Sequence, residues 1–244
     1  MQKLGISINV RREIFIKDPC STDLGKKILE LGIQLIDHYG LEDFNFKKLA
    51  QKIGSTESSI YRYFENKHTM FIYLINWYWE WTSTRIDIAQ FNIQDPYQKL
   101  ENIINALIET SYINVDIPYI DEETLHRIVV REGTKAYHHK LVDDENSTGF
   151  FLAYKNLCKK ISEVLLEINP EYEFPKALAS TLLESCNNNI YFARHLPRLT
   201  DIKNTEDPVQ LNRQLSKFLT SLVLRNLNNH HSAKEHLLES YSST

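Results

Sequence analysis

The sequence predicts an all-α fold, and three observations lead to this prediction. Only seven glycines and seven prolines occur in 244 residues, so signals for tight turns are few. Long stretches place apolar residues three and four positions apart, which is the spacing of one face of an α-helix. Alternation of the kind that indicates a strand is confined to the segment from Ile6 to Ile16.

The stretch from Asn45 to Phe64 predicts two short helices joined by a tight turn. The first helix has one apolar face, formed at helical spacing by Phe46, Leu49, Ala50 and Ile53. Gly54 suits the left-handed conformation that ends a helix, and Ser55 or Thr56 can cap the next. Ile60 and Phe64 anchor that second helix, over 57–64, inward. Such a unit is either an ordinary packed pair or a helix-turn-helix, whose second helix fits the DNA major groove.

Positively charged side chains stand at the starts of two helices in this region. Lys47 and Lys48 follow the expected cap Asn45, and Lys67 and His68 open an apolar helix over 67–81. A helix N-terminus carries partial positive charge, so lysine there is mildly unfavourable. The placement favours a docked anion such as a DNA phosphate, and solvated surface lysines are the alternative.

These residues resemble the DNA-binding domain of TetR-family transcriptional regulators, over residues 24–81. The family pattern runs from a first helix ending near glycine, through a polar cap, an apolar–alanine pair and a glycine turn, to an aromatic ending and a lysine. Here its elements are Gly40, Asn45, Leu49-Ala50, Gly54-Ser55-Thr56, Ile60-Tyr61-Arg62-Tyr63-Phe64 and Lys67.

The resemblance implies DNA-binding residues in and around the two short helices. They are Asn45, Lys47, Lys48, Thr56, Glu57, Ser58, Ser59, Tyr61, Arg62, Tyr63 and Lys67. Glu57 departs from the lysine that commonly begins the recognition helix in this family. Its carboxylate either accepts a hydrogen bond from a cytosine amino group or merely starts the helix, facing solvent.

Four regions are predicted along the chain. They are an N-terminal arm over 1–20, a helix-turn-helix DNA-binding domain over 21–81 with its motif at 45–64, a helical body over 82–227 and a polar tail over 228–244. The arm is either a short hairpin or an extended segment. In the body we expect helices over 96–114, 121–133, 150–168, 175–195 and 208–227, with a polar loop over 137–149.

The resemblance also assigns roles to the body, which would bind a small-molecule effector and form a homodimer. Polar or aromatic residues within its apolar helices are the effector-binding candidates: Tyr112, His126, Tyr154, Cys158, Asn188 and Tyr191. An apolar stripe on the last two helices is the candidate dimer surface: Leu178, Leu182, Leu211, Leu215, Phe218, Leu219 and Leu222. An ordinary core role is the alternative for both sets.

Composition and motifs exclude several other classes of protein. The net charge is −4, and residues 1–81 carry +1, so DNA affinity would depend on a few well-placed cations. The three cysteines form no CxxC pair, and neither a nucleotide-binding loop nor a catalytic motif is present. We therefore expect no enzyme, no cofactor and no metal site; His138 and His139 are adjacent and cannot easily share an ion. A cytoplasmic location is expected.

The sequence therefore predicts a DNA-binding transcriptional regulator. We expect a ligand-responsive repressor that acts as a homodimer on a palindromic DNA operator and responds to an unknown small molecule. The alternatives are an activator with the same DNA-binding domain, or a helical interaction protein that has lost DNA binding.

Overall fold

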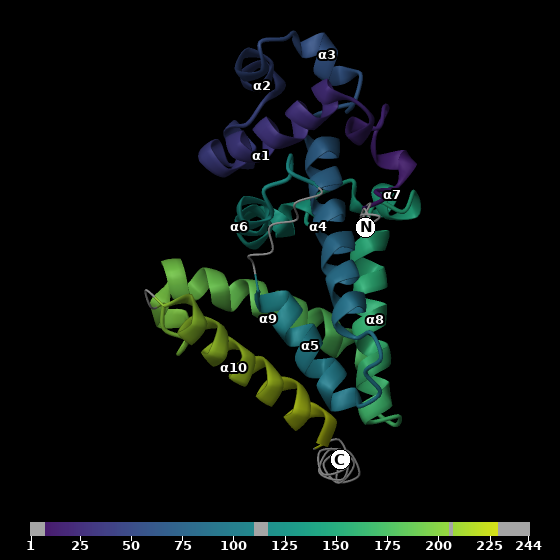
Figure 1. The fold of residues 1–244 in the computed structure, drawn as a ribbon, viewed down its shortest axis with the longest axis vertical. Coiled ribbons are helices and arrows are strands. Elements are labelled where there is room, and N and C mark those ends of the chain that lie inside the picture. The colour runs from purple at the N-terminus through teal and green to yellow at the C-terminus, as the bar shows by residue number, and fades with distance from the viewer. Residues whose placement is uncertain (1–7, 110–116, 205–206, 229–244) are drawn as a thin grey trace, which may run out of the picture. The chain divides into compact units, whose positions relative to one another are not determined.

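The computed structural model describes residues 8–109, 117–204 and 207–228, and every regular element in these ranges is a helix (Figure 1). The α-helices are α1 (Asp23–Asp43), α2 (Phe46–Ile53), α3 (Glu57–Tyr61), α4 (Lys67–Ala89), α5 (Pro96–Ile108), α6 (Glu122–Glu132), α7 (Val142–Ser147), α8 (Leu152–Ile168), α9 (Pro175–His195) and α10 (Pro208–Asn228). Short 3-10 turns are η1 (Arg12–Ile14), η2 (Pro19–Ser21), η3 (Gly133–Ala136) and η4 (Pro197–Leu199). The predicted all-α fold is confirmed.

The chain folds as two compact units. The first contains residues 1–83 and 110–155, and the second contains residues 84–109 and 156–244, each with the gaps in description given above. The first unit therefore joins α1, α2 and α3 to α6 and α7, which come much later in the sequence. No helix among the described residues is long and apolar enough to cross a membrane.

An aromatic core holds the first unit together. Its largest fully buried side chains include Phe71, Tyr73 and Trp77 of α4, together with Phe44 and Phe64. From Thr69 to Trp79, α4 is buried on every side. Helix α1 packs on α2, α6 and η2. A helix stretch that is buried all round and mostly apolar, here with Thr69 and Asn76 as exceptions, is expected where the rest of the fold surrounds it.

Local signals explain where the helices of the first unit begin and end. Thr22 caps α1 by accepting from the Gly25 amide at 3.1 Å. Gly40 interrupts α1 with φ 76° and ψ 163°, which agrees with the predicted first helix ending near this glycine. Asn66 and Thr69 bond reciprocally at the start of α4, where the Thr69 amide donates to Asn66 Oδ1 at 2.9 Å.

The second unit is a helical bundle in which α10 packs against α5 and α9. Leucines of α10 fill its interior, and Leu215 and Leu219 are completely buried. Lys99 of α5 pairs with Glu167 of α8 at 2.6 Å, and the side-chain amide of Asn169 donates to the Leu227 carbonyl at 2.8 Å. The predicted helices over 175–195 and 208–227 are confirmed within one residue.

Four local predictions were wrong or incomplete. Residues 8–16 contain no strand, because η1 turns the chain there and Ile14 is buried. The predicted loop over 137–149 contains α7, a helix without buried residues and therefore without an apolar period. Helix α5 ends at Ile108, short of Asn114, since Glu109 has extended backbone angles. Helix α4 continues past Trp81 to Ala89.

Candidate nucleic-acid interface

Helices α2 and α3 form the predicted helix-turn-helix. The Asn45 side chain accepts from the Lys48 amide at 2.9 Å and caps α2. Gly54 ends α2 in the left-handed conformation, with φ 75° and ψ 38°. Ile60 of α3 is completely buried, and the ring of Phe46 meets that of Tyr61 edge-on at 5.1 Å. The second helix ends at Tyr61 rather than at Phe64, so it is shorter than predicted.

One face of the helix-turn-helix carries exposed polar side chains that could reach DNA. Helix α3 and its cap expose Thr56, Glu57 and Ser58, and Tyr61 keeps 47% of its surface accessible. Ser59 is half-buried, and its hydroxyl lies 3.0 Å from that of Thr56. Small side chains such as Ser58 allow a helix to approach the floor of the major groove closely.

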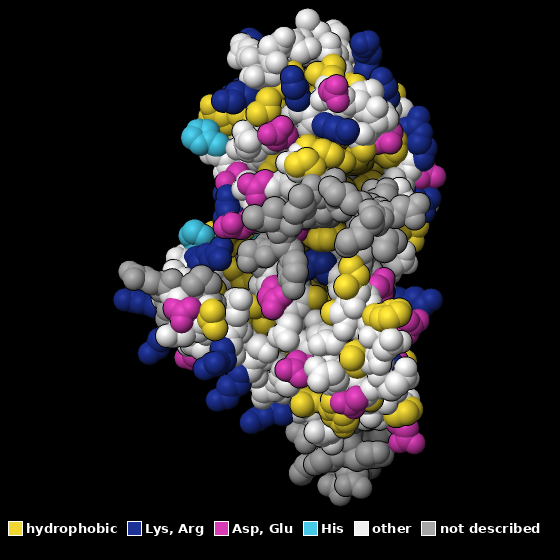
Figure 2. All heavy atoms as spheres, in the orientation of Figure 1, with side chains coloured by type: hydrophobic (Ala, Val, Ile, Leu, Met, Phe, Trp, Pro, Cys, Tyr) yellow, Lys and Arg dark blue, Asp and Glu magenta, His cyan; other side chains and the backbone are white. Residues whose placement is uncertain are grey.

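Three cations around this face have no ion pair or hydrogen bond within the described part of the chain. They are Lys47 and Lys52 of α2 and Arg62 directly after α3, and all three are exposed. Lys52 was not predicted from the sequence, although its position one turn beyond Lys47 and Lys48 gave a usable signal. Figure 2 shows lysine and arginine side chains interspersed with carboxylates over the region of α1 to α3, in keeping with its near-neutral charge.

Two lysines predicted to bind phosphate instead have partners within the protein. The Lys67 ammonium donates to the carbonyls of Leu41, Glu42 and Phe44 at 2.9, 2.7 and 3.1 Å. It thereby satisfies backbone acceptors at the C-terminal end of α1. Lys48 donates to the Asp43 carbonyl at 2.7 Å and lies 4.3 Å above the Tyr39 ring. The positions of Lys48 and Lys67 are thus explained without a bound anion.

Tyr63 occupies the interior rather than the predicted DNA-facing surface. Only 3% of its surface is accessible, and its hydroxyl lies 2.7 Å from Thr22 Oγ1, the cap of α1. Its carbonyl accepts from the Ile16 amide at 2.8 Å, so the segment before α1 is attached to this unit through Tyr63. The ring therefore positions α3 against α1.

A family model supplies the decisive comparison. Residues 28–74 match the model described as bacterial regulatory proteins, tetR family. This range contains both short helices and the first part of α4, up to residue 74. Residues 28–74 therefore form a TetR-family domain.

Solved structures share the fold of this chain over most of its length. The ketosteroid transcriptional regulator KstR2 of Mycobacterium tuberculosis has a TM-score of 0.55 at 14% identity, covering 89% of this chain and 96% of that one. AibR, in complex with isovaleryl coenzyme A and operator DNA, has a TM-score of 0.54 at 12% identity, covering 81% and 97%. A transcriptional regulator from Rhodococcus sp. Rha1 has 0.54 at 15%, covering 86% and 97%. No curated protein sequence matches the chain.

The predicted effector-binding residues are dispersed over the chain. In the first unit, buried His126 bonds through Nδ1 to the Tyr78 hydroxyl at 2.7 Å, and Tyr154 stacks on Tyr137 with ring centroids 5.2 Å apart. In the second, Asn188 is exposed, whereas Tyr191 and Cys158 are half-buried. Tyr112 lies outside the described residues. A groove of about 500 Å³ between α5 and α10 is lined by none of the six.

The predicted dimer stripe is mostly internal to the second unit of the regulator. Five of its leucines are buried within the protomer and fill the core: Leu178, Leu182, Leu211, Leu215 and Leu219. Leu222 is half-buried, and Phe218 keeps 42% of its surface accessible. The periodicity of the sequence identified the apolar face of α10. It did not distinguish residues of this chain's own core from residues of a surface that contacts a partner.

Proposed function

We propose that this regulator binds a palindromic DNA operator as a homodimer and represses transcription until a small molecule releases it. The observation that carries the proposal is the exposed face of α3, flanked by the unpaired cations Lys47, Lys52 and Arg62. The cations would contact phosphates and set the register, while Glu57 and Ser58 would meet base edges. Asn45, Thr56, Ser59 and Tyr61 would complete the contact surface.

Homodimerisation is part of the proposal because two recognition helices must address half-sites about one helical turn apart. Exposed Phe218 with Leu222 on α10 supports a paired-helix interface at this surface. Isologous pairing would place the same surface of both protomers in contact.

Effector control is proposed for the body of the chain, residues 82–227, with 21–81 as the DNA-binding domain. AibR, a structure of the same fold, was solved with both isovaleryl coenzyme A and operator DNA, which supports combined ligand and DNA binding. The effector would favour the dimer geometry that does not match operator spacing, so that DNA is released in the cytoplasm.

A gel-shift titration on DNA upstream of its own gene, repeated at several salt concentrations, tests DNA binding. If each protomer places three cations on phosphates, the logarithm of affinity should fall with that of salt with a slope of about −5. Lys47→Ala or Arg62→Ala should weaken binding and reduce the slope by about 2, because a dimer loses two contacts. Lys176→Ala, an exposed cation of α9, is the matched control.

The same titration separates the competing functions. No specific shift, and no effect of Lys47→Ala or Arg62→Ala on whatever binding occurs, would favour an interaction protein without DNA binding. Exposed Glu57 and the near-neutral charge of residues 1–81 are the observations behind that second candidate. An activator would bind the same DNA, and a transcription assay with and without the regulator distinguishes it from a repressor.

A further inference from the structure

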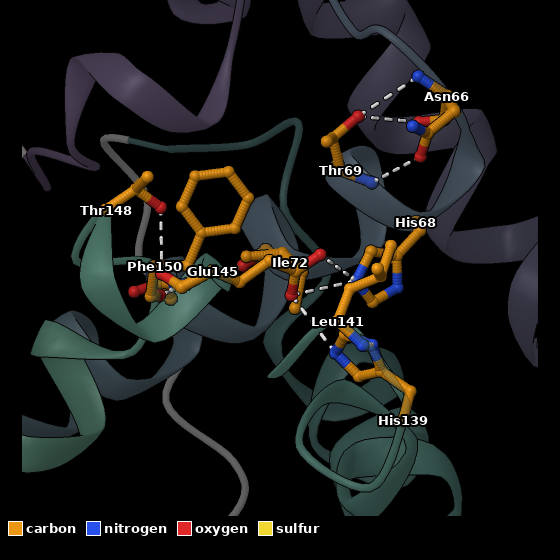
Figure 3. A network of polar contacts seen from close by, with 10 residues as sticks. Asn66, His68, Thr69, Ile72, His139, Leu141, Glu145, Thr148 and Phe150 are labelled. Atoms are coloured by element: carbon orange, nitrogen blue, oxygen red, sulfur yellow. Dashed lines mark hydrogen bonds and ion pairs between the residues drawn. The ribbon is translucent and has the colours of Figure 1, made fainter. Parts of the chain in front are cut away.

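Two histidines and a glutamate distant in sequence come together in the first unit (Figure 3). His68 Nε2 lies 2.9 Å from Glu145 Oε1, and His139 Nε2 lies 3.1 Å from Glu145 Oε2. The two imidazole rings are 4.7 Å apart between centroids. One potential ligand atom from each residue lies within 4.8 Å of the other two. We call these three residues the His–Glu cluster.

Separate elements hold each member of the His–Glu cluster in place. His68 stands in the first turn of α4, where the Asn66–Thr69 bonds fix the start of the helix. Glu145 belongs to α7, and its amide donates to the Leu141 carbonyl at 3.1 Å. The side chains of His68, His139 and Glu145 keep only 30, 22 and 13% of their surfaces accessible. The site is therefore sheltered but can be reached from solvent.

The donor atoms and their spacing suit a divalent transition-metal ion. Two imidazole nitrogens and a carboxylate oxygen form the set found at zinc sites that retain an open fourth position. With bonds of about 2.0–2.1 Å, ligand atoms of a tetrahedral ion lie roughly 3.3 Å apart. The contacts of 2.9 and 3.1 Å are already close to this spacing. We propose that the His–Glu cluster binds a divalent transition-metal ion, with zinc as the test ion.

Binding requires a proton rearrangement at His139. Its Nδ1 lies 3.3 Å from the Leu141 amide, which donates to it, so the proton of the neutral ring is on Nε2. An ion must replace that proton, because a metal binds the lone pair of neutral imidazole. The ring then carries its proton on Nδ1, and the long Leu141 contact is given up.

The ion would connect α7 to the start of α4. His68 directly follows Lys67, whose ammonium holds the C-terminal end of α1. A bound ion would therefore stabilise the turn of α4 that positions the helix-turn-helix. Because metal binds the folded site only, the apparent stability should rise with zinc concentration.

Titration of the purified full-length protein with Zn²⁺ and Co²⁺ tests the site. Tail residues His230, His231 and His236 are replaced by alanine in every sample, because histidine pairs there could bind metal themselves. We expect one ion per protomer by calorimetry, and a Co²⁺ spectrum of low-coordinate type without a thiolate charge-transfer band. Melting temperature should rise with either ion.

Neighbouring histidines provide the matched comparison. His139→Ala and Glu145→Gln should each weaken Zn²⁺ binding by at least about 10–100-fold, the range for losing a residue that only hydrogen-bonds to a metal ligand. His138→Ala, an exposed change one residue away, should leave it unchanged. Equal binding by the His138 and His139 variants, or no binding by a folded parent protein, would overturn the proposal and leave a hydrogen-bonded His–Glu–His group. Circular dichroism establishes that each variant is folded.

Discussion

At the scale of single residues, Lys67 illustrates how one side chain can fit two explanations. Its position at the start of α4 predicted a phosphate contact, because a cation there opposes the helix dipole. In the structure its three donor hydrogens are used by three carbonyls at the end of α1. The residue therefore connects α4 to the segment that leads into the helix-turn-helix.

We predict that Lys67→Ala destabilises the protein, whereas Lys47→Ala does not. Loss of the Lys67 ammonium leaves three carbonyls without their donor, two of them in partly buried hydrogen bonds, which we expect to cost about 2 kcal/mol of unfolding free energy. Lys47 is exposed and its replacement should stay within about 0.5 kcal/mol. Urea unfolding followed by circular dichroism measures both. Equal stabilities would contradict the structural role assigned to Lys67.

Cys186 should be chemically inert in the native protein. Burial raises the pKa of its thiol to about 12, and its Sγ contacts the Leu107 carbonyl at 3.7 Å. Thiolate is the reactive form, so a maleimide reagent at pH 8 should modify Cys186 only after unfolding. Half-buried Cys20 and Cys158 should react faster. Mass spectrometry of peptides after timed labelling checks this order, which rapid native labelling of Cys186 would refute.

Residue pairs close in sequence were predictable, and distant pairs were not. The cap bond from the Lys48 amide to Asn45 depends on local backbone geometry, and so does the helix end at Gly54. The residue types at these positions are enough to predict that geometry. His68 and Glu145 are separated by 77 positions, and only the packing of α7 beside α4 brings them together. The expectation of no metal site considered His138 and His139 with the acidic residues that follow them, among them Glu145, and did not include His68.

At the scale of elements, helices with an apolar period were predicted well. Helix α9 begins at Pro175 and ends at His195 as expected, because proline suits a first turn and apolar residues recur between these ends. Helix α7 was missed because none of its residues is fully buried, so burial imposed no apolar pattern on them. On α10, the packing against α5 and α9 determines which leucines face the interior.

Helix α6 allows a test of capping and its pH dependence. Asp121 accepts from the Thr124 amide at 3.1 Å and from its hydroxyl at 2.6 Å. Partial burial raises the pKa of Asp121, but the Thr124 bonds and the Arg127 charge outweigh it and leave the pKa below its ordinary value of 3.8. Its charge therefore stabilises the fold above about pH 4, and this contribution is lost as pH falls further.

We predict that Asp121→Ala lowers stability by about 1 kcal/mol at pH 7. The difference from the parent protein should shrink below pH 4, when the parent carboxylate becomes protonated. Asp121→Asn retains a cap and should lose less. Denaturant unfolding at pH 7 and pH 3.5 measures these differences. A deficit of Asp121→Ala that grows in acid would contradict the sign assigned to the shift.

At the scale of the whole molecule, the helix-turn-helix shares a compact unit with α6. The Tyr78 hydroxyl of α4 contacts His126 Nδ1 of α6 at 2.7 Å, and Trp81 donates to Glu122 Oε2 at 2.6 Å. Arg127 of α6 also pairs with Asp37 of α1 at 3.1 Å. A ligand that displaced α6 would therefore disturb polar contacts to both α1 and α4. The effector proposed above could act through this helix.

Dimer formation can be separated from protomer stability on α10. Phe218 is 42% accessible, whereas Leu215, on the same helix, is completely buried. We predict that Phe218→Asp dissociates the dimer, because it places a charge at the proposed interface, and leaves the protomer fold intact. Leu215→Ala should instead lower unfolding free energy by about 2–5 kcal/mol.

Sedimentation velocity over a range of concentrations measures the association, and circular dichroism measures the fold. Phe91→Asp is the matched control, since Phe91 lies in the same unit with 78% of its surface accessible. We expect Phe91→Asp to leave the dimer unchanged, because exposure alone does not make a phenylalanine part of an interface. A dimer that survives Phe218→Asp would place the contact surface elsewhere, and the loss of dimer in both variants would remove the specificity claimed for α10.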